Sequence, residues 1–116
     1  MDRIDFDENW NNKLLGDVFS TIRPGTKKYN LQGRYAIYLK DRFFCYADII
    51  AIDKFTLDEI MERKIHLTDT GRTDKDFLEL IESFYGKKTW WKDGETQLYV
   101  LYFKKIVQTS LFDQLP

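Results

Sequence analysis

The chain has 116 residues but only one cysteine, Cys45, and one histidine, His66. A single cysteine cannot form an intramolecular disulfide, so the sequence is typical of a protein from a reducing compartment. A single histidine excludes any site that needs two histidine ligands to a metal ion. The sequence also contains no Ser-His-Asp pattern, no phosphate-binding glycine loop and no metal-ligand spacing. We therefore expect neither a metal nor a cofactor.

Long apolar runs and an excess of one charge are missing as well. No stretch approaches the ~18 apolar residues that span a bilayer, and residues 1–5 have no signal-peptide core. We expect a cytoplasmic protein that does not associate with membranes. The formal net charge is −1, which argues against a protein that coats nucleic acid with its whole surface. A local basic patch is still compatible with that charge.

Aromatic side chains are abundant, at 16% of the residues, and this enrichment favours strands. The pattern of apolar residues predicts strands at 18–23, 34–40, 43–52 and 96–107. The third of these is an almost continuous apolar run, which is typical of a strand buried on both faces. The length indicates one domain, residues 1–107, followed by an exposed tail, residues 108–116.

Three helices are predicted, over residues 7–15, 57–63 and 73–85. Thr56 and Glu59 have the spacing of a capping box, and Thr73 with Asp76 opens the last helix. Gly16 is expected to end the first helix. Because strands dominate and do not alternate with helices, we predict an α+β fold. Its form is a small, partly open β-barrel with two or three short helices packed at its ends.

The segment Ser20-Thr21-Ile22-Arg23 places two polar side chains at the end of a predicted strand. A basic turn with Lys27 and Lys28 follows it. The hydroxyl of Thr21 and the guanidinium of Arg23 could hold a base edge or a phosphate. Alternatively, Arg23 stabilises the end of the barrel by pairing with an acid such as Asp69. The sequence leaves both interpretations open.

Other residues have a functional and a structural interpretation. Asp69 could be a general base, but we expect it to cap a helix or a turn. The rings of Tyr85 and Trp90, near several lysines, could stack on unpaired bases. We expect Cys45 to be a small buried residue without catalytic function and His66 to have a structural or surface role.

With these residues in view, the chain resembles the ASCH domain family of the PUA-like superfamily. The resemblance implies a β-barrel with a cleft beside the Thr21-Ile22-Arg23 strand, which PUA-like relatives use for RNA or for modified bases and nucleosides. It covers roughly residues 16–107. Its landmarks are Thr21-Ile22-Arg23, Gly33, Ala47-Asp48-Ile49, Phe55-Thr56-Leu57, Leu67-Thr68-Asp69-Thr70-Gly71, Phe84-Tyr85 and Gln97-Leu98-Tyr99-Val100-Leu101-Tyr102-Phe103.

The chain is also distantly similar to small bacterial enzymes of this family that hydrolyse N4-acetylcytidine. Their catalytic pattern is a lysine three residues before the threonine, the threonine itself, and a glutamate before the second long helix. Here Thr21 is present, but the lysine position is Val18 and the glutamate position falls near Asp69 or Thr70. Since valine carries no charge, the sequence favours binding, with an amidohydrolase acting on a modified nucleoside as the alternative.

We therefore expect the cleft to bind nucleic acid, RNA above all, or a modified nucleoside. The residues expected to contact this ligand are Thr21, Arg23, Lys27, Lys28, Asp69, Tyr85 and Trp90.

The tail offers a second kind of partner. Gln108-Thr109-Ser110-Leu111-Phe112 resembles the peptide that binds the bacterial sliding clamp. In such a peptide Leu111 and Phe112 would fill an apolar pocket and Gln108 would fix the register. The alternative is that these apolar residues pack back onto the barrel.

Overall fold

The structure is a computed structural model that describes residues 2–26 and 28–106. The predicted tail, with its proposed clamp contacts, and Lys27 lie outside the described residues. The elements, in chain order, are β1 (Arg3–Phe6), η1 (Trp10–Leu15), β2 (Val18–Pro24), β3 (Arg34–Leu39), β4 (Arg42–Thr56), α1 (Leu57–Glu62), α2 (Ile65–Thr70), α3 (Asp74–Tyr85), η2 (Asp93–Glu95) and β5 (Gln97–Lys105).

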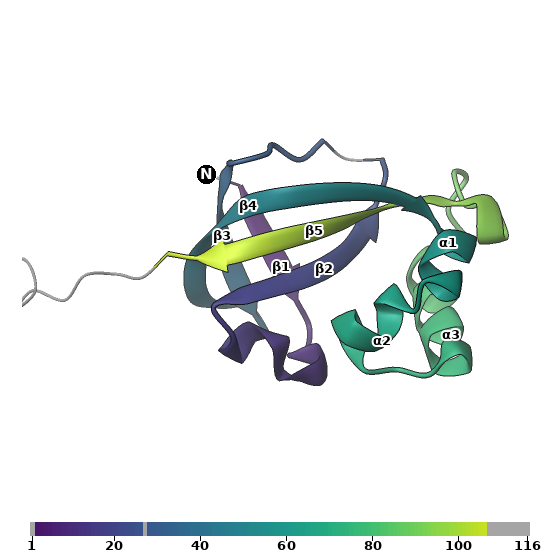
Figure 1. Cartoon of the computed structure of the whole chain (residues 1–116), viewed down its shortest axis with the longest axis horizontal. Helices are drawn as coiled ribbons and strands as arrows, with labels where there is room; N and C mark the ends of the chain where they lie inside the picture. The colour runs from purple at the N-terminus through teal and green to yellow at the C-terminus, as the bar shows by residue number, and fades with distance from the viewer. Residues whose placement is uncertain (1, 27, 107–116) are drawn as a thin grey trace, which may run out of the picture.

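Five strands form one curled sheet in the order β1-β3-β4-β5-β2. β1 runs parallel to β3, and the other neighbours are antiparallel. Figure 1 shows the sheet bent around on itself, with α1, α2 and α3 gathered at one end and η1 below the opposite end. The two edge strands, β1 and β2, border an open seam. This is the partly open α+β barrel that the sequence predicts.

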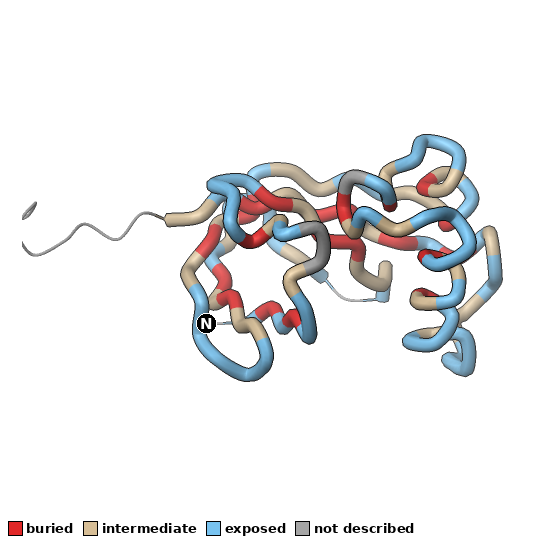
Figure 2. Tube along the Cα trace, turned by 90° about the horizontal axis from the view of Figure 1, so that it is seen from below, coloured by how far each residue is buried: buried red, intermediate tan, exposed pale blue. Residues whose placement is uncertain are grey.

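Two apolar clusters stabilise this arrangement, and β5 contributes to both. One face of β5 points into the barrel, where the ring of Phe103 stacks on that of Phe19 with centroids 5.3 Å apart. The other face, with Leu98 and Val100, packs under the helices against Phe77 and other apolar residues of the second cluster. Figure 2 shows the buried segments following the strands and the inner sides of the helices.

The prediction that residues 43–52 are buried on both faces is wrong. Phe43, Phe44 and Ile50 are exposed on β4, whereas Ala47 and Ile49 are buried. A register irregularity near each end of this stretch breaks the simple alternation of faces. Cys45 is half-buried and packs against the barrel cluster, so the expectation that it is buried holds only in part.

The helices begin and end at local signals. The Thr56 hydroxyl accepts a hydrogen bond from the Glu59 backbone, and the Glu59 carboxylate accepts one from the Thr56 backbone, which confirms the capping box. Thr73 caps α3 in the predicted way. The predicted helix at 7–15 is a shorter 3-10 helix, which ends before Gly16. Among the described residues, no helix is long and apolar enough to cross a membrane.

Candidate functional site

A cleft of about 390 Å³ opens at the seam between β1 and β2, facing α3. We call it the Thr21 cleft. β1 and the residue after it form one border, η1 and β2 form the floor, and the end of α2 with α3 closes the opposite side. The lining residues are Asp5, Phe6, Asp7, Lys13, Thr21, Ile22, Arg23, Asp69, Thr70, Phe77, Leu80, Ile81, Phe84, Tyr85 and Lys88.

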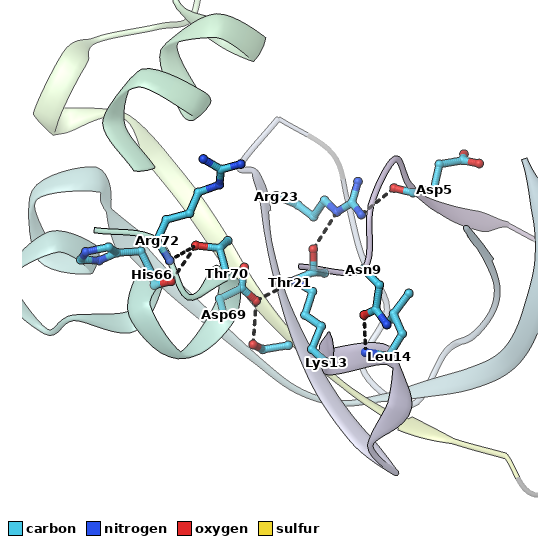
Figure 3. Close-up of polar contacts among 11 residues, drawn as sticks. Asp5, Asn9, Lys13, Leu14, Thr21, Arg23, His66, Asp69, Thr70 and Arg72 are labelled. Carbon is cyan, nitrogen blue, oxygen red and sulfur yellow. Dashed lines mark hydrogen bonds and ion pairs between the residues drawn. The ribbon is translucent and has the colours of Figure 1, made fainter. Parts of the chain in front are cut away.

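A buried ion pair lies at the inner end of this cleft. The Lys13 Nζ atom is 3.0 Å from Asp69 Oδ1, and the two side chains are 7% and 3% exposed. The Ser20 hydroxyl donates a second hydrogen bond, of 2.7 Å, to the same carboxylate oxygen. Figure 3 shows Lys13 and Asp69 converging beneath Thr21. Burying charged groups costs a substantial free energy of desolvation, which pairing partly offsets. This ion pair forms the polar floor of the cleft.

Arg23 crosses the seam of the barrel at the mouth of the cleft. Its Nε donates a hydrogen bond of 3.1 Å to Thr21 Oγ1, and its Nη2 donates one of 2.8 Å to the backbone oxygen of Asp5 on the opposite edge strand. Its guanidinium also lies over the Phe6 ring, 4.8 Å from the centroid. Within the described residues, no carboxylate forms an ion pair with Arg23. The alternative in which Arg23 pairs with Asp69 is therefore wrong, but its contacts with Thr21 and Asp5 do join the two edge strands at this end of the barrel. The guanidinium also lines the cleft.

α3 supplies an apolar and aromatic wall. Phe77 and Ile81 are buried beneath it, and Leu80, Phe84 and Tyr85 border the opening. The ring of Tyr85 lies 5.4 Å from that of Trp90, centroid to centroid. The cleft thus has polar and charged groups on its β2 side and flat apolar rings on its α3 side.

Burial changes the acidity of two groups in the cleft. Burial lowers the pKa of the Lys13 ammonium, and attraction to Asp69 opposes part of this change. Burial raises the pKa of the Tyr85 hydroxyl, while the charge of Arg23 acts in the opposite sense. Both shifts follow from the low exposure of these groups to water, which disfavours their charged forms.

The position of Asp69 depends on how α2 is held. α2 begins after Lys64, which has a left-handed backbone, and ends at Gly71, whose φ of 71° favours glycine. The buried His66 ring packs against Phe77, with its Nε2 atom 2.6 Å from Asp74 Oδ1 on α3. These contacts confirm a structural role for His66 and fix α2 against α3.

The predicted capping role of Asp69 is wrong. The carboxylate accepts hydrogen bonds from Lys13 and Ser20. The following helix, α3, is capped by Thr73, and the backbone N–H of Gly71 closes α2 on Leu67 O. The reason is tertiary. The last turn of α2 packs against η1 and β2, so its carboxylate meets the Lys13 amine, which is 56 positions away in the chain.

The structure brings four of the predicted ligand residues into the Thr21 cleft and places two others elsewhere. Thr21, Arg23, Asp69 and Tyr85 line the cleft. Lys28 is exposed and lines a neighbouring cleft, and Trp90 lines a third cavity with Gly25 and Thr26. Lys27, Gln108, Leu111 and Phe112 lie outside the described residues.

Lys13 is the site residue that sequence reasoning missed. It belongs to the short segment Asn12-Lys13-Leu14-Leu15, where a lysine between polar and apolar neighbours is indistinguishable from a surface lysine. Only the packing of η1 against α2 shows that its amine is buried. Among residues 2–26 and 28–106, no group of three or more histidine, cysteine, aspartate or glutamate side chains is placed to hold a metal ion.

The curled sheet, its strand order and the helices at one end match the fold of a solved ASCH protein. The chain is similar to a crystal structure of the S128A mutant of ZmASCH from Zymomonas mobilis. The TM-score is 0.59 and the sequence identity is 12%, and the match covers 95% of this chain and 73% of that one. No protein-family model matches the chain, and no curated protein matches it.

Proposed function

We propose that the Thr21 cleft binds a nucleoside, in particular one with a modified base, either free or within RNA. The observation that carries this proposal is the pairing of a polar floor with an aromatic wall in a cleft of about 390 Å³. That volume lies within the usual range of ~300–1,000 Å³ for small-molecule sites. A base is flat and apolar on its faces and polar at its edges, which matches the two sides of this cleft.

The polar groups supply both donors and acceptors for a base edge. Arg23 has guanidinium hydrogens beyond those used by Thr21 and Asp5, and the Thr21 hydroxyl can donate its own proton while it accepts from Arg23 Nε. Lys13 and Asp69 neutralise each other at the floor. The interior therefore suits an uncharged base better than a phosphate, which would stay near Arg23 at the mouth.

The test is isothermal calorimetry with adenosine, guanosine, uridine, cytidine and N4-acetylcytidine. We expect saturable binding of at least one of them. Thr21→Val removes one neutral hydrogen bond, worth ~0.5–1.5 kcal/mol, and should weaken binding up to about tenfold. Tyr85→Leu removes a stacking surface worth ~1–3 kcal/mol. The control is Phe44→Leu, because Phe44 is exposed on β4 and is not among the residues that line the cleft. No binding of any nucleoside would contradict the proposal.

A second candidate function, hydrolysis of a modified nucleoside, is favoured by Lys13. Strand position 18 holds a valine, but η1 delivers an amine with a lowered pKa to the same cleft as Thr21. In this scheme Lys13 first passes its proton to the Asp69 carboxylate, the Thr21 oxygen then attacks the acetyl carbonyl of N4-acetylcytidine, and the Thr21 proton passes to the neutral amine so formed. The C–N bond breaks, cytidine leaves with that proton, and water then hydrolyses the threonyl ester to acetate.

This alternative is tested by chromatography of N4-acetylcytidine incubated with the pure protein. Hydrolysis predicts equal amounts of cytidine and acetate, and loss of turnover in both Thr21→Val and Lys13→Met. If the wild-type protein binds the nucleoside but releases no cytidine, hydrolysis is excluded and binding stands. Turnover that survives in both variants would also refute the roles given to these two residues.

A further inference from the structure

A second cleft continues the Thr21 cleft along the same seam of the barrel. It has a volume of about 450 Å³, and we call it the Tyr29 cleft. Along β1, residues 2–5 line the Tyr29 cleft and residues 5–7 line the Thr21 cleft, so the two follow one another. Asp5 and Arg23 line both. The Tyr29 cleft is completed by Lys28, Tyr29 and Tyr35, which follow β2 in the chain.

The cations of the Tyr29 cleft are only partly neutralised. Arg3 is held by the carboxylate of Asp5, whereas Arg23 and Lys28 form no ion pair with any carboxylate of the described residues. The lining contains three cations (Arg3, Arg23 and Lys28) and two carboxylates (Asp2 and Asp5), a net charge of +1. Because the whole chain has a net charge of −1, this excess at the seam indicates an anionic ligand.

Aromatic rings stand beside these charges. The Tyr29 ring is half-buried, lies 6.4 Å from the Tyr35 ring and meets the Tyr99 ring edge-on at 5.9 Å. The Tyr35 hydroxyl accepts a hydrogen bond from the Asn30 backbone, which fixes the loop after β2. A positively charged groove with fixed aromatic rings is the usual arrangement for binding an unpaired nucleic-acid strand.

We infer that the protein binds a single strand of RNA along the seam, with one base in the Thr21 cleft and the next nucleotide in the Tyr29 cleft. The inference rests on the proposed function and specifies its ligand as a strand. Arg23, which borders both clefts, contacts the phosphate between the two nucleotides. Lys28 contacts the following phosphate and Tyr29 stacks on the second base. A base-paired duplex is excluded because both bases must be unstacked to reach these rings.

The test is fluorescence anisotropy with a fluorescein-labelled RNA pentanucleotide pool of random sequence, at 50 and 200 mM salt. Two phosphate contacts predict a slope of log affinity against log salt of about −1.4, since each contact on a single strand contributes ~0.7. Affinity should therefore fall about sevenfold over this range for the wild type. Lys28→Gln leaves one contact, so its affinity should fall only about threefold.

Matched variants separate the strand from the nucleoside. Lys75→Gln removes another exposed lysine, on α3, that lines neither cleft, and should behave as the wild type. Tyr29→Leu should weaken pool binding about fivefold or more, the loss expected for one stacked base. Because Lys28 is exposed and forms no ion pair within the described residues, Lys28→Gln should leave the fold and nucleoside binding in calorimetry unchanged.

The outcomes distinguish the two proposals. Salt-sensitive binding of the pool that weakens in Lys28→Gln and not in Lys75→Gln supports a strand along the seam. Nucleoside binding in calorimetry, with no binding of the pool or with equal binding by wild type and Lys28→Gln, overturns the strand and leaves the proposed function intact. If neither nucleosides nor the pool bind, both proposals fail.

Discussion

Removing one partner of the buried Lys13–Asp69 pair should destabilise the protein far more than removing both. In Lys13→Met, the Asp69 carboxylate stays 3% exposed and keeps only the hydrogen bond from Ser20. Breaking a buried pair in this way costs ~3–5 kcal/mol. We expect about 3 kcal/mol for Lys13→Met, because the Ser20 hydroxyl still satisfies one oxygen.

The double variant Lys13→Met/Asp69→Leu leaves no buried charge. Replacement of both partners by apolar groups is often close to neutral. The double variant should therefore lose at least ~2 kcal/mol less free energy of unfolding than the two single variants lose in total. The assay is urea unfolding at pH 7, followed by fluorescence of the three tryptophans. Single variants that cost less than ~1 kcal/mol, or an additive double variant, would refute the buried pair.

The pH dependence of the same pair has a definite sign. The pKa of Lys13 is lowered in the folded state, so between that pKa and the unfolded value of 10.5 the unfolded chain binds more protons. Stability contributed by this group therefore rises with pH across that window. Asp69→Asn removes the attraction that opposes the lowering of the Lys13 pKa. Stability, measured by urea unfolding between pH 7 and 10.5, should therefore rise more with pH in this variant than in the wild type.

Other predictions concern the fold. Thr56→Ala removes the capping box of α1 and should cost ~1 kcal/mol in urea unfolding. Phe103→Ala empties the middle of the barrel and should cost ~3–5 kcal/mol, with a value under ~1 kcal/mol contradicting its central position. Hydrogen bonds from Lys64 and His66 lower the pKa of Asp74 below 3.8 in the folded state. The stability that Asp74 contributes is therefore complete above pH 3.8 and is lost as the pH falls through the folded pKa. Acid unfolding of Asp74→Asn should therefore depend less on pH than that of the wild type.

The sequence predicted the elements that carry local signals. β2, β3, β4 and β5 follow apolar and aromatic runs, and α1 and α3 begin at side-chain caps. Thr21 and Arg23 were found because a strand end places them next to a turn.

The elements without local signals were missed. β1 has only four residues and pairs with β3 through contacts more than 30 positions apart. α2, with its β-branched residues, has weak helical propensity and depends on packing against η1 and α3. Lys13 was missed for the same reason, because its burial results from a contact between η1 and α2 that no local pattern encodes.

The central claim is that a nucleoside occupies the Thr21 cleft, and a two-dimensional NMR titration of the full-length protein with N4-acetylcytidine and cytidine tests it most directly. We expect shifts of the backbone signals of Thr21, Arg23, Asp69 and Tyr85, with little change at the exposed Phe43 and Phe44 on β4. Saturating nucleoside that leaves the four cleft signals unmoved, or moves only those of the outer sheet, would contradict it.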